Sequence, residues 1–171
     1  MTKCILALDQ GTTSSRAIAF NEHGLPVHLE QEALPLSYPH PGWVEQDPTQ
    51  LWAGQLAVAE RVMQRGDLEL CAVGVANQRE TTIIWDRSGK PIYPAIVWQD
   101  RRTASRCLEL KQQSDPFAIR EKTGLVIDPY FPATKIEWIL DHVPGARKRA
   151  EAGELDVADE GEDHPDRRGG R

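Results

Sequence analysis

Three short, continuous apolar runs constrain the fold of this chain more than any other feature of its sequence. They cover residues 4–8 (Cys-Ile-Leu-Ala-Leu), 71–76 (Cys-Ala-Val-Gly-Val-Ala) and 95–98 (Ala-Ile-Val-Trp). Each run has the length of a strand, and its apolar residues are consecutive instead of alternating with polar ones. Such runs are typical of strands that are covered on both faces, as in α/β proteins.

Further strands extend this pattern into a mixed sheet. Residues 16–20 and 81–85 also have the composition of strands. Turn signals at Gly11 and Gly24 divide the first 35 residues into short segments. The start of the chain therefore predicts an antiparallel meander.

Helices are predicted between and after these strands. The strongest start signal is Asp47-Pro48-Thr49-Gln50, in which Asp47 can cap a helix and Pro48 suits its first turn. This helix is expected to end at Gly66. Its inward face is expected to carry Trp52, Leu56, Ala59 and Met63. Further helices are expected over about residues 102–113, 115–124 and 133–143.

The bulk composition is that of an ordinary globular protein. The 171 residues are 40% hydrophobic and 27% charged, which suits one domain or a part of a larger protein. The net charge of −6 disfavours nucleic acid as the main partner. No apolar run reaches the roughly 18 residues of a membrane helix, and three widely spaced cysteines favour a reducing compartment. We therefore expect a cytoplasmic protein without membrane insertion.

The end of the chain differs in composition from the rest. Residues 156–171 hold six acidic residues and three arginines, with Val157 and Ala158 almost their only apolar side chains. Such a segment buries too little surface to offset the entropy lost on ordering. We expect a disordered charged tail there, after a domain that covers residues 1–155.

Polar side chains follow each of the three apolar runs directly. The clusters are Asp9-Gln10, residues 77–80 (Asn-Gln-Arg-Glu) and residues 99–102 (Gln-Asp-Arg-Arg). Ligands of open α/β sheets bind outside the carboxyl ends of the strands, so three clusters at three such ends predict one shared cleft. The alternative is that these residues belong to ordinary solvated loops.

Residues 9–16 (Asp-Gln-Gly-Thr-Thr-Ser-Ser-Arg) are the most informative segment. The acid at a strand end can hold a magnesium ion, and Gly11 allows a tight turn and a close approach of phosphate to the backbone. Four successive hydroxyl residues add donors, and Arg16 adds a fixed cation. The segment therefore predicts a phosphate-binding turn between two strands. A polar hairpin without a ligand is the alternative.

These residues resemble a known family. Residues 9–16 are similar to the first phosphate motif of the superfamily that contains sugar kinases, heat-shock proteins and actin. Three further stretches resemble the glycerol kinases within the FGGY carbohydrate kinase family: residues 41–48 (PGWVEQDP), 77–82 (NQRETT) and 124–131 (GLVIDPYF). The resemblance spans nearly all of residues 3–155.

The resemblance implies an α/β fold of the actin-like ATPase (ribonuclease H-like) class. It implies a mixed sheet with an N-terminal antiparallel meander, flanking helices, and an N-terminal FGGY kinase domain that is incomplete. Residues 156–171 depart from the family pattern, because relatives continue with an apolar strand after Leu155.

The implied reaction is the transfer of the γ-phosphoryl group of ATP, with Mg²⁺, to a terminal hydroxyl of glycerol. Asp9 is assigned to the metal by the resemblance. The phosphate-binding residues are Gly11, Thr12, Thr13, Ser14 and Arg16. The glycerol-binding residues are Arg79, Glu80, Trp98 and Tyr130. A surface ion pair is the alternative for Arg79 and Glu80, and simple packing is the alternative for Trp98 and Tyr130.

The resemblance places the catalytic carboxylate, which takes the hydroxyl proton, beyond this chain. We therefore assign no catalytic residue within it and expect the isolated chain to be inactive. The family also implies that full-length relatives form homo-oligomers. Two other functions remain open at this point: a kinase for another polyol or a sugar, and a non-catalytic remnant or ATP-binding module.

Overall fold

The structure of the chain, a computed structural model, describes residues 1–113 and 115–159. Its strands form two four-stranded sheets, with the orders β3-β2-β1-β5 and β4-β7-β6-β8. The strands are β1 (Thr2–Gln10), β2 (Ser14–Asn21), β3 (Pro26–Ala33), β4 (Glu45–Gln46), β5 (Leu68–Asn77), β6 (Thr82–Asp86), β7 (Ala95–Ile96) and β8 (Leu155–Asp159). The helices are α1 (Pro48–Met63), α2 (Ala104–Gln113), α3 (Pro116–Thr123), α4 (Pro132–His142) and α5 (Ala146–Glu151).

The predicted meander and mixed sheet are confirmed. Strands β1 and β2 pair antiparallel, with Asp9 opposite Arg16, and β2 pairs antiparallel with β3. On its other side β1 pairs in parallel with β5, where Gln10 lies opposite Asn77. The carboxyl ends of β1 and β5 therefore lie side by side, and the polar residues that follow them share one end of the sheet.

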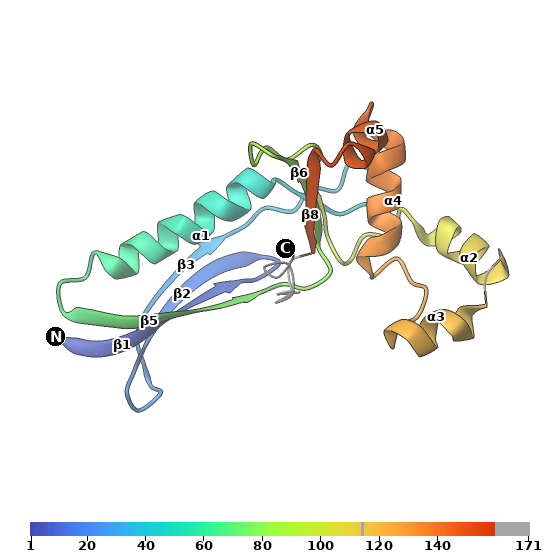
Figure 1. Cartoon of the computed structure of the whole chain (residues 1–171). Coiled ribbons are helices and arrows are strands. Elements are labelled where there is room, and N and C mark those ends of the chain that lie inside the picture. Colours follow the sequence, from blue (N-terminus) through green and yellow to red (C-terminus); the bar gives the residue numbers. More distant parts are fainter. Residues whose placement is uncertain (114, 160–171) are drawn as a thin grey trace, which may run out of the picture.

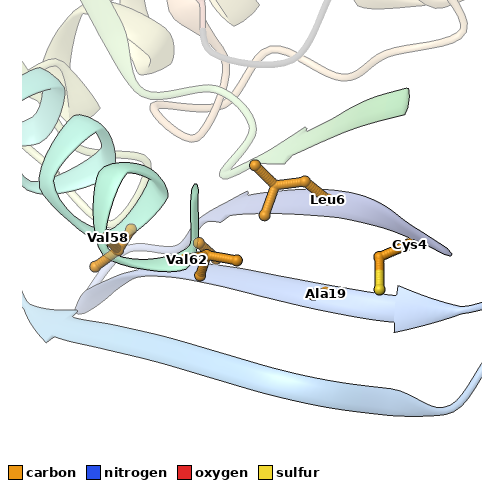
Figure 2. Packing of buried hydrophobic residues seen from close by; sticks show 6 residues of the cluster. Cys4, Leu6, Ala19, Val58 and Val62 are labelled. Carbon is orange, nitrogen blue, oxygen red and sulfur yellow. The ribbon is translucent and has the colours of Figure 1, made fainter. Parts of the chain in front are cut away.

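Helix α1 covers one face of this sheet, as Figure 1 shows. Its start is the predicted one, because the Asp47 side chain accepts a 2.8 Å hydrogen bond from the Thr49 backbone N–H and Pro48 occupies the first turn. Val58 and Val62 are fully buried against the strands. Figure 2 shows them facing the strand that carries Leu6.

The inward face expected for α1 is wrong for three of its four residues. Trp52, Leu56 and Met63 are 70%, 41% and 52% exposed, and only Ala59 of the expected set is buried. The helix contacts the sheet through smaller residues instead. A Cβ at Gly54 would lie 3.3 Å from a Leu34 methyl group, so the helix approaches the sheet too closely for a large side chain there. Close backbone approach therefore decided the face, which side-chain hydrophobicity alone does not predict.

Strand β5 forms as predicted but is not buried on both faces. Val73 and Val75 are 59% and 74% exposed. The strand lies at an edge of its sheet, and α1 packs over β1, β2 and β3. In the described part of the chain no element packs beyond β5, so its continuous apolar sequence has no matching cover there.

The second sheet packs against α4. Its core joins Ile84 of β6, Ile96 of β7 and Ile139 of α4, all nearly or fully buried. The predicted strand over residues 95–98 is shorter than expected, because only Ala95 and Ile96 pair, yet Val97 beside them is fully buried. Figure 1 shows α2 to α5 gathered beyond this sheet, far from the N-terminus.

The expected disordered tail is wrong for its first residues. Strand β8 includes residues 156–159 and pairs antiparallel with β6, with Val157 opposite Ile84. The average composition of residues 156–171 did not reveal that its first residues can pair with the free edge of β6. Residues 160–171 lie outside the described residues. Among the described residues, no helix has both the length and the apolar sequence that crossing a membrane requires.

Candidate functional site

The predicted turn between β1 and β2 forms at residues 11–13. The Gly11 N–H donates a 2.9 Å hydrogen bond to the Ser14 carbonyl, and the Leu34 N–H donates a bond of the same length to the Thr13 carbonyl. A Cβ at position 11 would lie 3.0 Å from the Ser14 carbonyl oxygen, so the turn has no space for a side chain there. Thr13 is exposed and Thr12 half-buried, which leaves the hairpin tip accessible to a ligand.

Asp9 and Arg16 form an ion pair at the base of this hairpin. Their opposed positions in the β1–β2 register bring Arg16 Nη2 to 2.8 Å from Asp9 Oδ2. The two side chains are 35% and 40% exposed, so both can still reach a ligand. Magnesium in phosphate sites takes one or two carboxylates and completes its shell with waters and phosphate oxygens. The accessible Asp9 carboxylate fits that role.

The segment that follows β5 lies beside this hairpin. The Gln78 backbone N–H donates a 2.7 Å hydrogen bond to the Gln10 carbonyl, so the first two predicted polar clusters adjoin each other. Arg79 is exposed and Glu80 is half-buried. Glu80 has a φ of 66°, the only positive φ of a non-glycine residue in the described ranges. Such strain persists only where neighbouring groups hold it, and it occurs often at functional sites.

Lys135 holds both predicted acceptor segments, and the sequence analysis missed it. Its side chain is fully buried, and Nζ donates hydrogen bonds of 2.8 Å to the Glu80 carbonyl and 2.7 Å to the Tyr130 carbonyl. A signal was present in the sequence, because Lys135 precedes the buried Ile139 by four residues and so shares its helix face. A lysine on a core-facing stripe is rare unless it has partners.

Trp98 connects the predicted phosphate hairpin with the predicted acceptor residues. Its indole N–H donates a 3.0 Å hydrogen bond to the Thr12 hydroxyl. Its ring packs edge-to-face against Tyr130, with centroids 5.8 Å apart. Because Lys135 also ties Tyr130 to Glu80, the structure brings Thr12, Trp98, Tyr130 and Glu80 into one connected cluster.

The third predicted polar cluster, residues 99–102, lies partly in the interior and does not line the surface of the hairpin with all of its residues. Asp100 and the Arg102 side chain are buried, and Arg102 forms ion pairs of 2.8 Å with both Asp100 and Glu45. The Arg102 guanidinium also lies 3.9 Å from the centroid of the Trp43 ring. Burial by itself lowers the pKa of Arg102, but the hydrogen bonds to Asp100 and Glu45 outweigh it and raise that pKa. This network anchors the segment around Trp43.

Comparisons with known proteins match most of the length of this chain. A family model described as the FGGY family of carbohydrate kinases, N-terminal domain, matches residues 4–156. The chain is 57% identical over 157 residues to a glycerol kinase of Parabacteroides distasonis. The aligned residues cover 90% of this chain and 32% of that relative. It is 56% identical over 155 residues to a glycerol kinase of Chromobacterium violaceum, covering 88% and 31%. The chain thus spans about a third of the length of these relatives.

Solved structures show the same likeness in three dimensions. A structure of Plasmodium falciparum glycerol kinase with ADP matches with a TM-score of 0.87 and 30% identity, covering 92% of this chain and 32% of that one. A xylulose kinase from Rhodospirillum rubrum matches with a TM-score of 0.80 and 29% identity, covering 92% and 32%. The actin-like α/β fold class expected from the sequence is therefore confirmed. The chain belongs to the FGGY family of carbohydrate kinases and matches its N-terminal domain.

Proposed function

We propose that this chain forms the phosphate-binding and acceptor-binding part of a kinase that phosphorylates glycerol to sn-glycerol 3-phosphate with ATP. The observation that carries the proposal is the hydrogen bond between Trp98 and Thr12, which brings the phosphate hairpin into contact with the predicted acceptor residues. Relatives named glycerol kinase are 52–57% identical to this chain over nearly all of its described length. That level of identity supports glycerol as the acceptor.

The hairpin supplies the nucleotide side of the proposed site. Asp9 would hold Mg²⁺, and the metal when bound neutralises charge on the phosphate oxygens. Arg16 would approach those oxygens from beside Asp9. Backbone N–H groups and hydroxyls of residues 12–14 would donate hydrogen bonds to the phosphates. The Gly11 N–H is already bonded to the Ser14 carbonyl and holds the tip in a tight turn.

The acceptor side is built from residues with complementary roles. Arg79 would donate to a glycerol hydroxyl, and the Glu80 carboxylate would accept from one. The Tyr130 hydroxyl can do either, and Trp98 would pack against the carbon chain. A site made to hydrogen-bond hydroxyls discriminates strongly, because a ligand without them leaves its polar groups unpaired.

Phosphoryl transfer breaks the bond between the γ-phosphorus and the ADP oxygen and forms a bond to the glycerol oxygen, whose proton must leave. We assign no residue of this chain as the proton acceptor. The chain's own contribution to the reaction is to position the two substrates and to neutralise charge, which supplies most of the catalysis in this reaction class. We place this reaction in the cytoplasm, in a homo-oligomeric full-length enzyme.

The test uses a chimeric kinase. Residues 1–155 of this chain replace the matching segment of the Chromobacterium violaceum relative, which is 56% identical over 155 residues. Glycerol, xylulose and gluconate are offered with MgATP, and the phosphorylated product is measured. We expect glycerol to give the highest kcat/KM.

Two outcomes would contradict the proposal. Faster phosphorylation of xylulose or gluconate than of glycerol would show a kinase for another acceptor. Loss of all turnover, when the unaltered relative is active and the chimera binds MgADP, would favour a non-catalytic nucleotide-binding module. The matched control is the unaltered relative.

A further inference from the structure

Five hydrogen bonds form a closed circuit between the phosphate hairpin and the acceptor residues. The Thr12 carbonyl accepts from Gln46 Nε2 at 2.8 Å, and Gln46 Oε1 accepts from Gln78 Nε2 at 3.0 Å. Gln78 Oε1 accepts from the Thr81 hydroxyl at 3.0 Å, and Thr81 Oγ1 accepts from the Trp98 backbone N–H at 3.3 Å. The Trp98 indole N–H donates to the Thr12 hydroxyl at 3.0 Å, which closes the circuit.

The direction of every bond in this circuit is fixed. The Thr12 carbonyl can only accept, so Gln46 must present its NH₂ group there and its oxygen to Gln78. Gln78 must in turn donate to Gln46 and accept from Thr81. At the other end the Trp98 backbone N–H can only donate, which fits the Thr81 hydroxyl as acceptor. The donor and acceptor of each bond are therefore consistent with those of the adjacent bonds, and no single amide or hydroxyl can turn around without breaking a bond.

The linking residues are shielded from water. Gln46 is 2% exposed, Gln78 is 8% exposed and Thr81 is fully buried. Buried hydrogen bonds are strengthened by the low dielectric constant around them, and a buried group without its partner costs the full desolvation penalty. The circuit therefore resists distortion. It also joins four separate segments: the hairpin, β4, the β5–β6 connection and the segment that follows β7.

We propose that Gln46, Gln78 and Thr81 are positioning residues that fix the separation between the phosphate-binding hairpin and the acceptor site. The inference rests on the proposed function, because it assigns Thr12 to the phosphates and Trp98 to the acceptor. These three residues touch neither substrate in the proposed arrangement and act through Thr12 and Trp98.

The physical need for such a device follows from the reaction. Reacting atoms must lie within about 3–3.5 Å of each other, and a displacement of about 1 Å can lower the rate about 100-fold. Thr12 lies in the turn between two strands of one sheet and Trp98 follows β7 of the other sheet, so the covalent chain alone does not hold them at that precision. Opening the circuit should lower the rate of transfer while each ligand keeps its own contacts.

The first experiment compares Thr81→Val with Thr81→Ser in the chimeric kinase. Valine has nearly the shape of threonine but removes the hydroxyl, whereas serine retains it. We expect Thr81→Val to lower kcat about 10- to 100-fold, with dissociation constants for glycerol and MgADP that stay within about threefold, a change of under 1 kcal/mol. Thr81→Ser should retain most of the activity. Similar behaviour of the two variants, or a loss confined to the dissociation constants, would overturn the proposal.

The second experiment opens the circuit at another link. Gln46→Met keeps the side-chain length and removes both hydrogen bonds. If one circuit is involved, Thr81→Val combined with Gln46→Met should cost no more than the worse single change, because an opened circuit cannot be opened again. Losses of kcat that multiply would show two independent packing defects and overturn the proposal.

A third measurement does not depend on catalysis. In the full 171-residue chain, labelled with ¹⁵N, exchange of the Trp98 indole proton reports its bond to Thr12. We expect faster exchange in Thr81→Val than in Thr81→Ser, and equal rates would contradict the circuit. A chimeric kinase that fails to phosphorylate glycerol while this exchange difference is present would contradict the proposed function and leave the circuit standing.

Discussion

The side-chain amine of Lys135 donates a 2.8 Å hydrogen bond to the backbone carbonyl of Glu80, although 55 positions separate the two residues in the chain. The same amine holds the Tyr130 carbonyl at 2.7 Å. Glu80 has a backbone conformation that costs about 1–3 kcal/mol for a residue other than glycine. The buried cation therefore stabilises a strained residue in the middle of the proposed acceptor site.

We predict that Lys135→Met weakens glycerol binding more than nucleotide binding in the chimeric kinase. Hydrogen bonds to a charged group contribute about 1.5–3 kcal/mol, which corresponds to roughly a 10- to 150-fold rise in the dissociation constant of glycerol. Isothermal titration with glycerol and with MgADP measures both. Lys135→Arg is the control because it keeps the positive charge. Equal losses for the two ligands would show that Lys135 stabilises the fold as a whole.

We predict that Glu80→Ala weakens glycerol binding far more than ATP binding. The proposed role of the carboxylate is to accept a hydrogen bond from a glycerol hydroxyl, and the Glu80 carbonyl bond to Lys135 involves the backbone, which alanine retains. The expected loss is about 1.5–3 kcal/mol for glycerol. Glu80→Gln, which keeps an acceptor oxygen, should lose less. A loss of the same size for ATP would indicate a structural role.

We predict that Gly11→Ala lowers the affinity of the chimeric kinase for MgADP about tenfold or more, which corresponds to about 1.4 kcal/mol. The new Cβ would lie 3.0 Å from the Ser14 carbonyl oxygen, a backbone atom that cannot move without opening the turn. Gly66→Ala is a matched control, since a Cβ there meets no atom within 4 Å. Unchanged nucleotide affinity in Gly11→Ala would contradict a phosphate-binding role for this turn.

We predict that Asp47→Ala destabilises the chain by about 1 kcal/mol, the usual contribution of a helix cap. The hydrogen bond from the Thr49 side chain, with backbone bonds from Thr49 and Gln50, lowers the pKa of Asp47 below its ordinary value of 3.8. A lowered pKa means that the ionised cap stabilises the fold at pH values above about 4. This stabilisation is lost as the pH falls through the lowered pKa.

Urea unfolding of the full chain at neutral and at acidic pH measures this effect. The gap in unfolding free energy between Asp47→Ala and the parent should shrink on acidification. Asp47→Asn, which caps without a charge, should lie between Asp47→Ala and the parent at neutral pH. A gap that is the same at both pH values would show that the carboxylate charge contributes nothing to the cap.

We predict that a polypeptide of these 171 residues alone has no measurable glycerol kinase activity. The proposed site in the described residues is open to solvent, since Asp9 and Arg16 are 35% and 40% exposed and Arg79 is exposed. Phosphoryl transfer requires both substrates in a cleft from which water is excluded. ADP release is measured with and without glycerol. Glycerol-dependent release that Asp9→Ala abolishes would contradict this prediction.

The sequence by itself determined the local elements of this protein. The apolar run at residues 4–8 and the turn at Gly11 predicted the β1–β2 hairpin, and Asp47-Pro48 predicted the start of α1, because caps, turns and strand composition act over a few residues. Parallel pairing of β1 with β5 placed the first two polar clusters together as expected. Residue chemistry predicted the phosphate-binding turn at residues 9–16, and motif resemblance supplied the family and the candidate glycerol-binding residues.

Tertiary structure decided what depends on contacts between distant segments. The Lys135 amine bonds the Glu80 carbonyl, 55 positions away, and the Thr12–Gln46–Gln78–Thr81–Trp98 circuit unites residues up to 86 positions apart. The inward face of α1 depended on how closely Gly54 approaches Leu34, and the exposure of Val73 depended on which elements cover β5. Hydrophobic pattern specifies that a residue can be buried, but only the packed neighbours determine whether it is.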